Sequence, residues 1–336
     1  MNEPKVLFFS RDPGATNQLV AVHEHLCSSS PSDTQAIAQA IATLRNRLDL
    51  SGDDRPQAVI VGKKYALDVW RAAGITAEDG SATTPDELIT RDIALVVTGT
   101  DDIDEPYTVS LWQAAQRNGI PVAVFLDNLV NLAVRFRTRD GDLITPDLVF
   151  ALDHQSSAEL TSAGIPQSNV QTTENFHLAR LKKIAENNQD ARNNIRTVWQ
   201  VDDATNVILF ASENAAEMSA LGRTAPYDEH AILGALIEDL AQGKTVGGLN
   251  PGEGSVMIII RPHPRDTAGK YDAYASSHAS PGAPAVQVSS AGAPLEAILA
   301  ADLVVGMDSA LLFEARSLGK PVLSRVIDSK FNELFS

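Results

Sequence analysis

Short apolar runs rich in β-branched residues alternate with longer amphipathic segments along most of the chain. This alternation is typical of βα units, in which crossover helices join parallel strands. In the first half it predicts strands at residues 5–10, 58–62, 94–98, 122–126 and 148–152. It predicts helices at residues 17–26, 65–73, 108–117 and 156–163. Glycines that suit a left-handed helix end follow three of these helices, at positions 74, 119 and 164. The first half is therefore expected to form one doubly wound domain.

The second half repeats the pattern after a polar helical segment at residues 176–198, which carries no strand signal. Strands are predicted at residues 207–211, 256–261, 285–288, 303–305 and 321–324, and helices at 228–241, 294–300 and 311–318. Two stretches rich in Gly, Ser, Ala or Pro are expected to be surface loops, at residues 243–255 and 276–285. The expected organisation is a domain at residues 1–175, a helical connector at 176–200 and a second domain at 201–336.

Length and composition agree with this organisation. A chain of 336 residues exceeds the roughly 250–300 residues at which a single core stops growing. The expected fold class is α/β, with two Rossmann-like domains facing a cleft. No apolar run approaches the ~20 residues of a membrane span, and the first residues lack the pattern of an export signal. Cys27 is the only cysteine, which excludes an internal disulfide and fits a reducing compartment, so a cytoplasmic location is expected.

The balance between acidic and basic residues limits the classes of partner that are expected. Acidic residues outnumber basic ones by 43 to 27, and the formal net charge is −16. Nucleic-acid binding needs clustered Lys and Arg, so a general nucleic-acid partner is not expected. Much of this acidity serves solubility. A negatively charged ligand must therefore meet a local positive site.

Ligands of open parallel sheets bind beyond the carboxyl ends of the strands, so the residues after each strand are the first candidates. Asp12, Gly14 and Asn17 lie where the first strand meets a helix, and the free N–H groups of that helix could receive an anion. The same residues could form an ordinary turn with Asp12 as a local cap. The segment lacks the glycine pattern of a dinucleotide site and the Gly-Lys-Ser/Thr of a P-loop, so neither NAD nor an ATPase is indicated.

A second group in this half follows the strand at residues 122–126. Asp127, Asn128 and Arg135 could fix sugar hydroxyls, or could hydrogen-bond the backbone of the turn. Both interpretations stay open.

In the second half, the sharpest candidate is Arg-Pro-His-Pro-Arg, residues 261–265. Two prolines stiffen this loop and hold the imidazole of His263 between Arg261 and Arg265, which can fork onto phosphate oxygens. A rigid cationic loop of this kind suits a diphosphate. Ser212 and Glu213, which follow the first strand of this half, could cradle a phosphate or cap a helix.

The last candidates lie where a strand meets the helix at residues 311–318. Asp308 and Ser309 stand at the junction, where Ser309 and the following N–H groups can receive a phosphate. Glu314 lies one and a half turns further along, where it can accept hydrogen bonds from ribose hydroxyls.

These motifs resemble a known group of enzymes. The Arg-Pro-His-Pro run together with DLVVGMDSALLFEARSLGKPV, residues 302–322, is similar to the donor domain of GT-B-fold nucleotide-sugar enzymes. That group includes glycosyltransferases and UDP-N-acetylglucosamine 2-epimerases. The His-Pro pair also resembles polysialyltransferases and CDP-glycerol glycerophosphotransferases. The resemblance covers residues 207–324 well, and the N-terminal half mainly through its architecture.

The resemblance implies transfer of a sugar from a nucleotide-activated donor to a hydroxyl acceptor, in surface polysaccharide or glycoconjugate synthesis. It implies a donor on the C-terminal domain, an acceptor on the N-terminal domain, and no metal or further cofactor. Positive groups then replace the ion, namely Arg261, Arg265, His263 and the helix end at Ser309. Asp12 is expected to take the acceptor's proton.

Two other functions stay open. The 2-epimerase pattern has two glycines after its Asp-Ser pair and paired acids on the helix. This chain has Ala310 and Leu311 there, and Glu314 alone, which favours a transferase. The third hypothesis is a non-catalytic, two-lobed protein that binds a nucleotide or a sugar. The sequence leaves the oligomeric state open.

Overall fold

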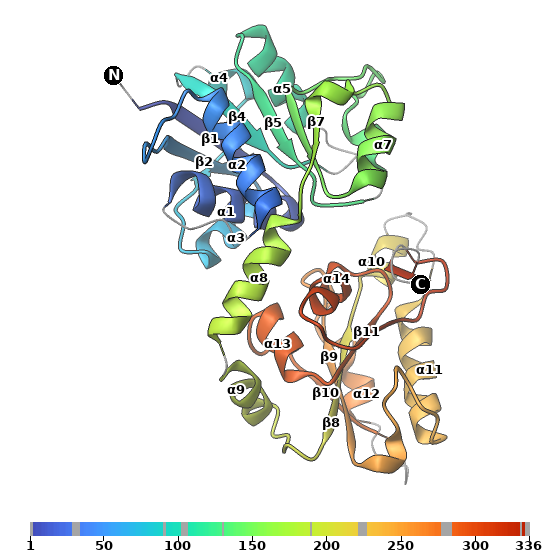
Figure 1. The fold of residues 1–336 in the computed structure, drawn as a ribbon. Coiled ribbons are helices and arrows are strands. Elements are labelled where there is room, and N and C mark those ends of the chain that lie inside the picture. Colours follow the sequence, from blue (N-terminus) through green and yellow to red (C-terminus); the bar gives the residue numbers. More distant parts are fainter. Residues whose placement is uncertain are drawn as a thin grey trace. The chain divides into compact units, whose positions relative to one another are not determined.

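The computed structural model describes residues 3–28, 34–89, 92–101, 107–129, 131–188, 190–220, 227–276, 284–329 and 331–332. The chain divides into two compact units, Met1–Arg180 and Leu181–Ser336, which we call unit 1 and unit 2 (Figure 1). Each unit is built on one parallel sheet, so the predicted α/β class with two parallel-sheet domains is confirmed. The predicted cleft concerns the placement of the two units and stays a prediction.

Unit 1 contains a parallel sheet of seven strands in the order β3-β2-β1-β4-β5-β6-β7. The strands are β1 Lys5–Ser10, β2 Gln57–Gly62, β3 Glu78–Asp79, β4 Ile93–Thr98, β5 Val122–Phe125, β6 Leu148–Ala151 and β7 Val170–Thr172. The first strand lies inside the sheet, next to the middle strand β4, and the winding reverses between β1 and β4. This reversal is the place where open α/β sheets form a crevice at their carboxyl edge.

Side chains of β1 alternate between two cores, because successive residues of a strand point to opposite faces. Val6 and Phe8 belong to one core, and Leu7 and Phe9 to the other. The first core is covered by α1 Pro13–Cys27, α2 Gln35–Arg47, α3 Ala66–Ala72 and the start of α8 Phe176–Asn187. The second is covered by α4 Pro85–Ile89, α5 Tyr107–Arg117, α6 Leu132–Arg135 and α7 His154–Ser162.

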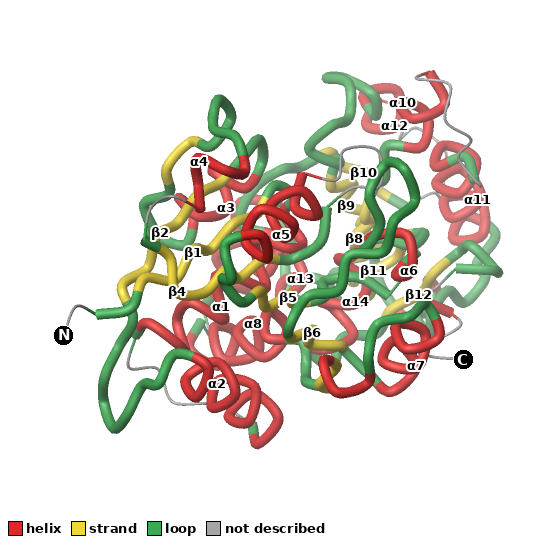
Figure 2. The backbone as a smooth tube through the Cα atoms, turned by 90° about the horizontal axis from the view of Figure 1, so that it is seen from above, coloured by secondary structure: helices red, strands yellow, loops and turns green. Residues whose placement is uncertain are grey.

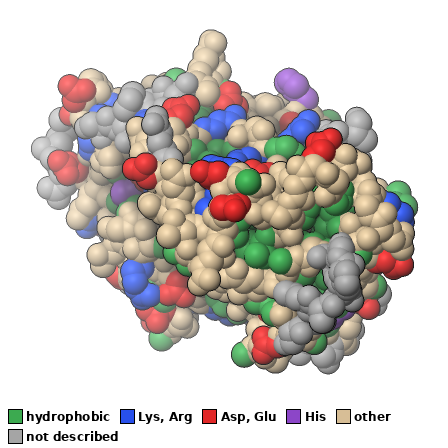
Figure 3. Space-filling view, turned by 90° about the horizontal axis from the view of Figure 1, so that it is seen from below, with side chains coloured by type: hydrophobic (Ala, Val, Ile, Leu, Met, Phe, Trp, Pro, Cys, Tyr) green, Lys and Arg blue, Asp and Glu red, His purple; other side chains and the backbone are tan. Residues whose placement is uncertain are grey.

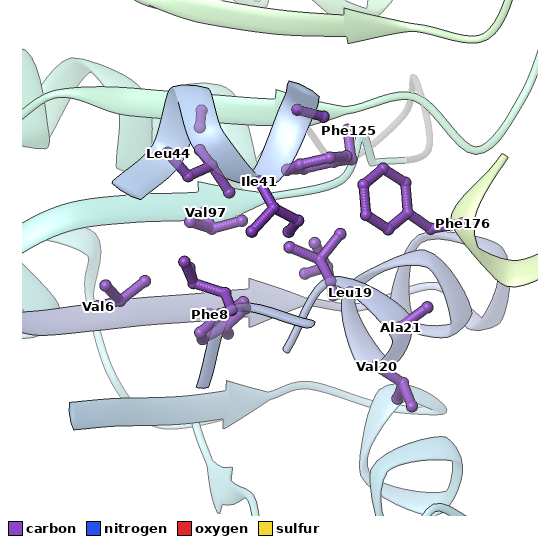
Figure 4. Packing of buried hydrophobic residues seen from close by; sticks show 14 of the residues in the cluster. Val6, Phe8, Leu19, Val20, Ala21, Ile41, Leu44, Val97, Phe125 and Phe176 are labelled. Atoms are coloured by element: carbon purple, nitrogen blue, oxygen red, sulfur yellow. The ribbon is translucent and has the colours of Figure 1, made fainter. Parts of the chain in front are cut away.

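The first core reaches the end of unit 1 through aromatic contacts (Figure 4). The ring of Phe176, at the start of α8, meets that of Phe125 edge-on with centroids 5.3 Å apart. Cys27 packs against the same core at the end of α1, and burial raises the pKa of its thiol to about 12.

Unit 2 contains a parallel sheet of five strands in the order β10-β9-β8-β11-β12. The strands are β8 Asn206–Ala211, β9 Val256–Arg261, β10 Ala285–Val288, β11 Leu303–Gly306 and β12 Val322–Ser324. One face is covered by α9 Ala191–Val198, α13 Pro294–Ala300 and α14 Ala310–Ser317, and the other by α11 Glu229–Ala241 and α12 Asp272–Ser276. Most strands of both sheets and most of their flanking helices are labelled in Figure 2. The short helix α10 Ala215–Ala220 follows β8.

The structure confirms most predicted elements to within a few residues. The predicted helix ends are also confirmed, because Gly74, Gly119 and Gly164 have φ angles of +74°, +67° and +106°. The residues predicted to form a connector, 176–200, contain α8 and α9, and the boundary between the two units falls within them, after Arg180. The predicted loop at 243–255 holds a 3-10 turn at Pro251–Glu253, and most of the predicted loop at 276–285 lies outside the described residues. The sequence analysis did not predict the helices α2, α4, α6, α10 and α12 or the short strands β3 and β7.

No helix within the described ranges is both long enough and apolar enough to cross a membrane. The excess of acidic residues does not form one block on the face drawn in Figure 3. Acidic and basic side chains stand there as separate small groups among uncharged atoms.

Candidate functional site

A pocket of about 530 Å³ lies at the carboxyl edge of the unit 2 sheet. Residues after β8, β9 and β10 and the first residues of α14 line it. Four residues predicted from the sequence are among them: Ser212, Arg261, His263 and Ser309. Glu213, Arg265, Asp308 and Glu314 are predicted site residues that are not in this lining.

Hydrogen bonds to Asp266 hold the loop that carries His263 in place. One carboxylate oxygen of Asp266 accepts the backbone N–H of His263 at 2.7 Å and the hydroxyl of Ser212 at 2.8 Å. The backbone N–H of Asp266 donates back to the carbonyl of His263 at 2.9 Å. With a proline on each side of His263, this loop is rigid before any ligand arrives.

The hydrogen bonds of the imidazole indicate its protonation state. The backbone N–H of Arg265 donates to Nδ1 of His263 at 3.1 Å, so Nδ1 carries no proton. Burial lowers the pKa of His263, and the nearby charges of Arg265 and Lys270 act in the same direction against that of Asp266. His263 is therefore neutral at pH 7 with its proton on Nε2. A neutral imidazole of this tautomer can donate a hydrogen bond to a phosphate oxygen.

A buried cluster of charges supports the loop. Nζ of Lys270 lies 2.7 Å from Asp266, 2.6 Å from Glu229 and 2.8 Å from Glu217, and the Lys270 side chain is only 6% exposed. Burial lowers the pKa of Lys270, but hydrogen bonds to the three carboxylates outweigh it, and the net pKa lies above its ordinary value. Lys270 is therefore a permanent cation that holds Asp266 in place. The sequence analysis did not identify this cluster.

Ser212 and Glu213 have structural partners. The hydroxyl of Ser212 also lies 2.5 Å from the hydroxyl of Tyr271. Glu213 accepts hydrogen bonds from the Tyr227 hydroxyl and, at 2.7 Å, from the backbone N–H of Asp308. Burial raises the pKa of Glu213, although these bonds oppose it. Glu213 thus connects the loop after β8 to the loop after β11.

Arg261 forms a side wall of the pocket. Its two terminal nitrogens donate to the carbonyls of Ala291 and Gly292 at 3.2 and 3.0 Å, and so hold the loop after β10. Burial lowers the pKa of Arg261, and the charges of Glu314 and Glu296 oppose this shift. Ser309 caps α14, because its hydroxyl accepts the N–H of Leu311 at 3.3 Å.

In unit 1, Gly14 and Asp127 are brought into contact. A Cβ atom on Gly14 would lie 2.5 Å from Oδ2 of Asp127, so this carboxylate rests on the first turn of α1. Thr100 donates a hydrogen bond to Asp127 at 3.2 Å, and Arg135 donates to Thr100 at 3.2 Å and to the carbonyl of Asp101 at 2.9 Å. Asn17 and Asn128 are half-buried.

Three carboxylates gather at this edge. Burial raises the pKa of Asp101 and of Asp127 to about 6, and the charge of Asp12 adds to both shifts. Arg11 partly offsets this at Asp101, 3.6 Å away. Asp12 is at the N-cap of α1, and its side chain makes no capping hydrogen bond there. Carboxylates that titrate near neutral pH can accept and release protons. Asp101 was not predicted.

Comparisons with known proteins identify the fold of these two units. No protein-family model matches the sequence, and no curated protein matches it significantly. Within the described parts of the chain, no group of three or more His, Cys, Asp and Glu is arranged to hold a metal ion.

Solved structures do match. UDP-GlcNAc 2-epimerase from Neisseria meningitidis, bound to UDP-GlcNAc, superposes with a TM-score of 0.60 at 16% identity, covering 98% of this chain and 85% of the other. A putative UDP-N-acetylglucosamine 2-epimerase from Listeria monocytogenes gives 0.58 at 12% identity, covering 96% and 79%. HepE from Anabaena, in complex with UDP-glucose, gives 0.51 at 14% identity, covering 98% and 82%. The sequence-based resemblance to GT-B-fold nucleotide-sugar enzymes is thereby confirmed at the level of the fold.

Proposed function

We propose that this protein is a glycosyltransferase that moves a sugar from a nucleotide-activated donor to a hydroxyl of a growing polysaccharide or glycoconjugate. One observation carries the proposal: the unit 2 pocket combines a preorganised Nε2–H donor on His263 with the capped N-terminus of α14. Donors held in place before the reaction stabilise charge that develops on a leaving phosphate. The fold supports a nucleotide-sugar ligand, since proteins of this fold carry UDP-sugars.

In the proposed reaction, the acceptor oxygen forms a bond to the anomeric carbon of the donor sugar. The bond from that carbon to the diphosphate oxygen breaks, and the diphosphate leaves with the electron pair. Asp12 or Asp127 takes the acceptor's hydroxyl proton, and His263 donates a hydrogen bond to the leaving phosphate. Arg265 and the helix end at Ser309 add positive potential, so no metal ion is required in this scheme.

The remaining predicted residues receive roles in the same scheme. Glu314 is proposed to hold the ribose hydroxyls, and Arg261 to define the width of the pocket through the loop that it holds. Glu213 and Ser212 are positioning residues. In unit 1, Gly14, Asn17, Asn128 and Arg135 are proposed to line the acceptor side.

Nucleotide binding tests the first half of this proposal. Thermal shift and calorimetry with UDP, CDP, GDP and CMP should find one nucleotide that stabilises the protein, because a ligand specific for the folded state raises its stability. His263→Ala and Glu314→Ala should each weaken that binding by roughly 1–3 kcal/mol, the scale of a lost hydrogen bond that leaves a partner unpaired. His154→Ala, at an exposed position of unit 1, is the matched control. Equal affinity in all variants would contradict the assignment.

Turnover tests the second half. A transferase should hydrolyse its donor slowly without acceptor and should keep this activity in a chelator. The 2-epimerase alternative predicts something different, namely inversion at C2 of UDP-GlcNAc with no acceptor, which NMR reads directly. Its support is the fold of the two epimerases. Nucleotide binding without any turnover would indicate a binding protein.

A further inference from the structure

Unit 1 holds a second pocket, of about 690 Å³, at the carboxyl edge of its sheet. Residues after β1 and β2, the first turns of α5 and the loop after α6 line it. None of the residues predicted from the sequence belongs to this lining. Four cations do: Arg11, Lys63, Lys64 and Arg139.

Lys63 has neutral partners among the described residues. Its Nζ donates to the carbonyl of Thr83 at 3.3 Å and lies 3.5 Å from the centroid of the Tyr107 ring. The hydroxyl of Tyr107 donates to the same carbonyl at 2.6 Å, which fixes the ring below the ammonium group. Lys63 is therefore held in position at the pocket by a carbonyl and a π face.

Lys64 has an unusual backbone. Its φ angle is +53°, in the left-handed region, which costs an L-residue with a Cβ roughly 1–2 kcal/mol. Strained residues of this kind cluster at ligand sites. Glycine would relieve the strain, but the sequence keeps a long cationic side chain that lines the pocket.

The charges around this pocket favour an anion. The chain as a whole carries −16, yet the lining has the four cations against Asp140 and Asp142, with Arg11 also paired to Asp101 at 3.6 Å. Burial lowers the pKa of Lys63, and the like charges of Arg11 and Lys64 lower it further, while Asp101 and Asp79 oppose the shift. Cations that repel one another at a concave surface are stabilised by a bound anion.

We propose that this pocket binds the phosphate group of a small, polar phosphomonoester. Lys63, Lys64 and Arg139 contact the phosphate oxygens, with Arg11 behind them, and Tyr107 and Gln113 contact the hydroxyl-bearing body of the ligand. The site rests on unit 1 alone. If the chain is a transferase as proposed above, the phosphate group belongs to its glycoconjugate acceptor.

Calorimetry at low ionic strength, with inorganic phosphate and glycerol 3-phosphate as probes, tests the site. Lys63→Met and Arg139→Ala should each weaken binding about tenfold, the effect of one charge-assisted hydrogen bond. Lys5→Met, at the opposite end of β1, and Arg117→Ala, an exposed cation at the end of α5, are the matched controls and should bind as wild type does. Arg139 is exposed, so its variant folds even if Lys63→Met does not.

Lys64→Gly separates binding from folding. It should weaken phosphate binding while the urea midpoint stays the same or rises, because glycine adopts positive φ without strain. The same titration of His263→Ala, in unit 2, shows which of the two pockets takes up the probe. Loss of phosphate binding in His263→Ala alone would overturn the proposal, because the anion site would then be the unit 2 pocket.

Three further outcomes would overturn it: no saturable phosphate binding, equal displacement by acetate at matched ionic strength, or binding of phosphatidic acid vesicles without binding of glycerol 3-phosphate. If the proposed glycosyltransferase function is wrong, the failure appears as an absence of nucleotide binding in unit 2, not as an absence of phosphate binding in unit 1.

Discussion

Asp266 accepts the backbone N–H of His263 at 2.7 Å and, through its other oxygen, lies 2.7 Å from Nζ of Lys270. A buried ion pair thus determines where the imidazole loop sits. Since Asp266 is 2% exposed, the pair is shielded from solvent and from salt.

The first prediction concerns Lys270. Lys270→Met leaves three carboxylates near one another without their cation, and breaking a buried pair costs about 3–5 kcal/mol of unfolding free energy. Urea denaturation measures this loss. Lys244→Met is the control, because Lys244 is 58% exposed and an exposed pair is worth about 1 kcal/mol or less. Equal effects of the two variants would contradict a structural role for the cluster.

The second prediction concerns the protonation of His263. Nitrogen NMR should find the Nε2–H tautomer and a pKa below the ordinary value, because burial disfavours the charged ring. The folded-state pKa is lowered, so this residue destabilises the protein once the pH falls below the pKa of the unfolded chain, and the penalty disappears as the pH rises above it. An imidazolium at pH 7 would contradict the proposed neutral donor.

The third prediction concerns Asp127. Its folded-state pKa of about 6 lies above the value of 3.8 for an unperturbed carboxyl, so ionisation destabilises the fold between about pH 4 and pH 6. Asp127→Asn cannot ionise. Its unfolding free energy relative to wild type should therefore rise between pH 4 and pH 7, by on the order of 1–3 kcal/mol. Urea titrations at both pH values measure the difference, and a constant difference would rule out the raised pKa.

The fourth prediction concerns Gly99, directly after β4. A Cβ atom there would lie 2.4 Å from the Cβ of Ala15 on α1 and 3.0 Å from its Cα. Gly99→Ala should destabilise the protein by about 1–3 kcal/mol, because backbone must move. Gly234→Ala, inside α11 with no atom within 4 Å of its Cβ, should instead be neutral or stabilising by up to about 1 kcal/mol. Unfolding curves for the two variants provide the comparison.

The central strands could be predicted because their apolar, β-branched runs are buried on both faces and bounded by turn residues. β1 and β9 begin and end at the residues that the hydrophobic pattern predicts. β7 could not be predicted, because its three half-buried residues carry no apolar run. The predicted pocket residues follow from a general property of parallel sheets, whose strand ends meet at one edge.

The supporting residues could not be predicted in this way. Lys270 meets Glu229 only after the chain has folded, since Glu229 begins α11 and Lys270 precedes α12, 41 residues further along. Glu213 is charged, as residues that contact ligands often are, but it accepts a hydrogen bond from the backbone N–H of Asp308 and so links two loops of the protein. Local sequence indicates which residues reach the edge of the sheet, but not which of them are used by the protein itself.

The pKa of about 12 for Cys27 has a practical consequence for spectroscopy. At pH 7 about one molecule in 10⁵ carries the thiolate, the form that maleimides attack, against a few per cent for an exposed cysteine. Probes can therefore be attached to introduced cysteines without first removing the native one. Exposed positions exist in both units, such as Arg71 and Ile327. A doubly labelled Arg71→Cys/Ile327→Cys protein would report the distance between the units, and its change on adding nucleotide, by electron spin resonance or energy transfer.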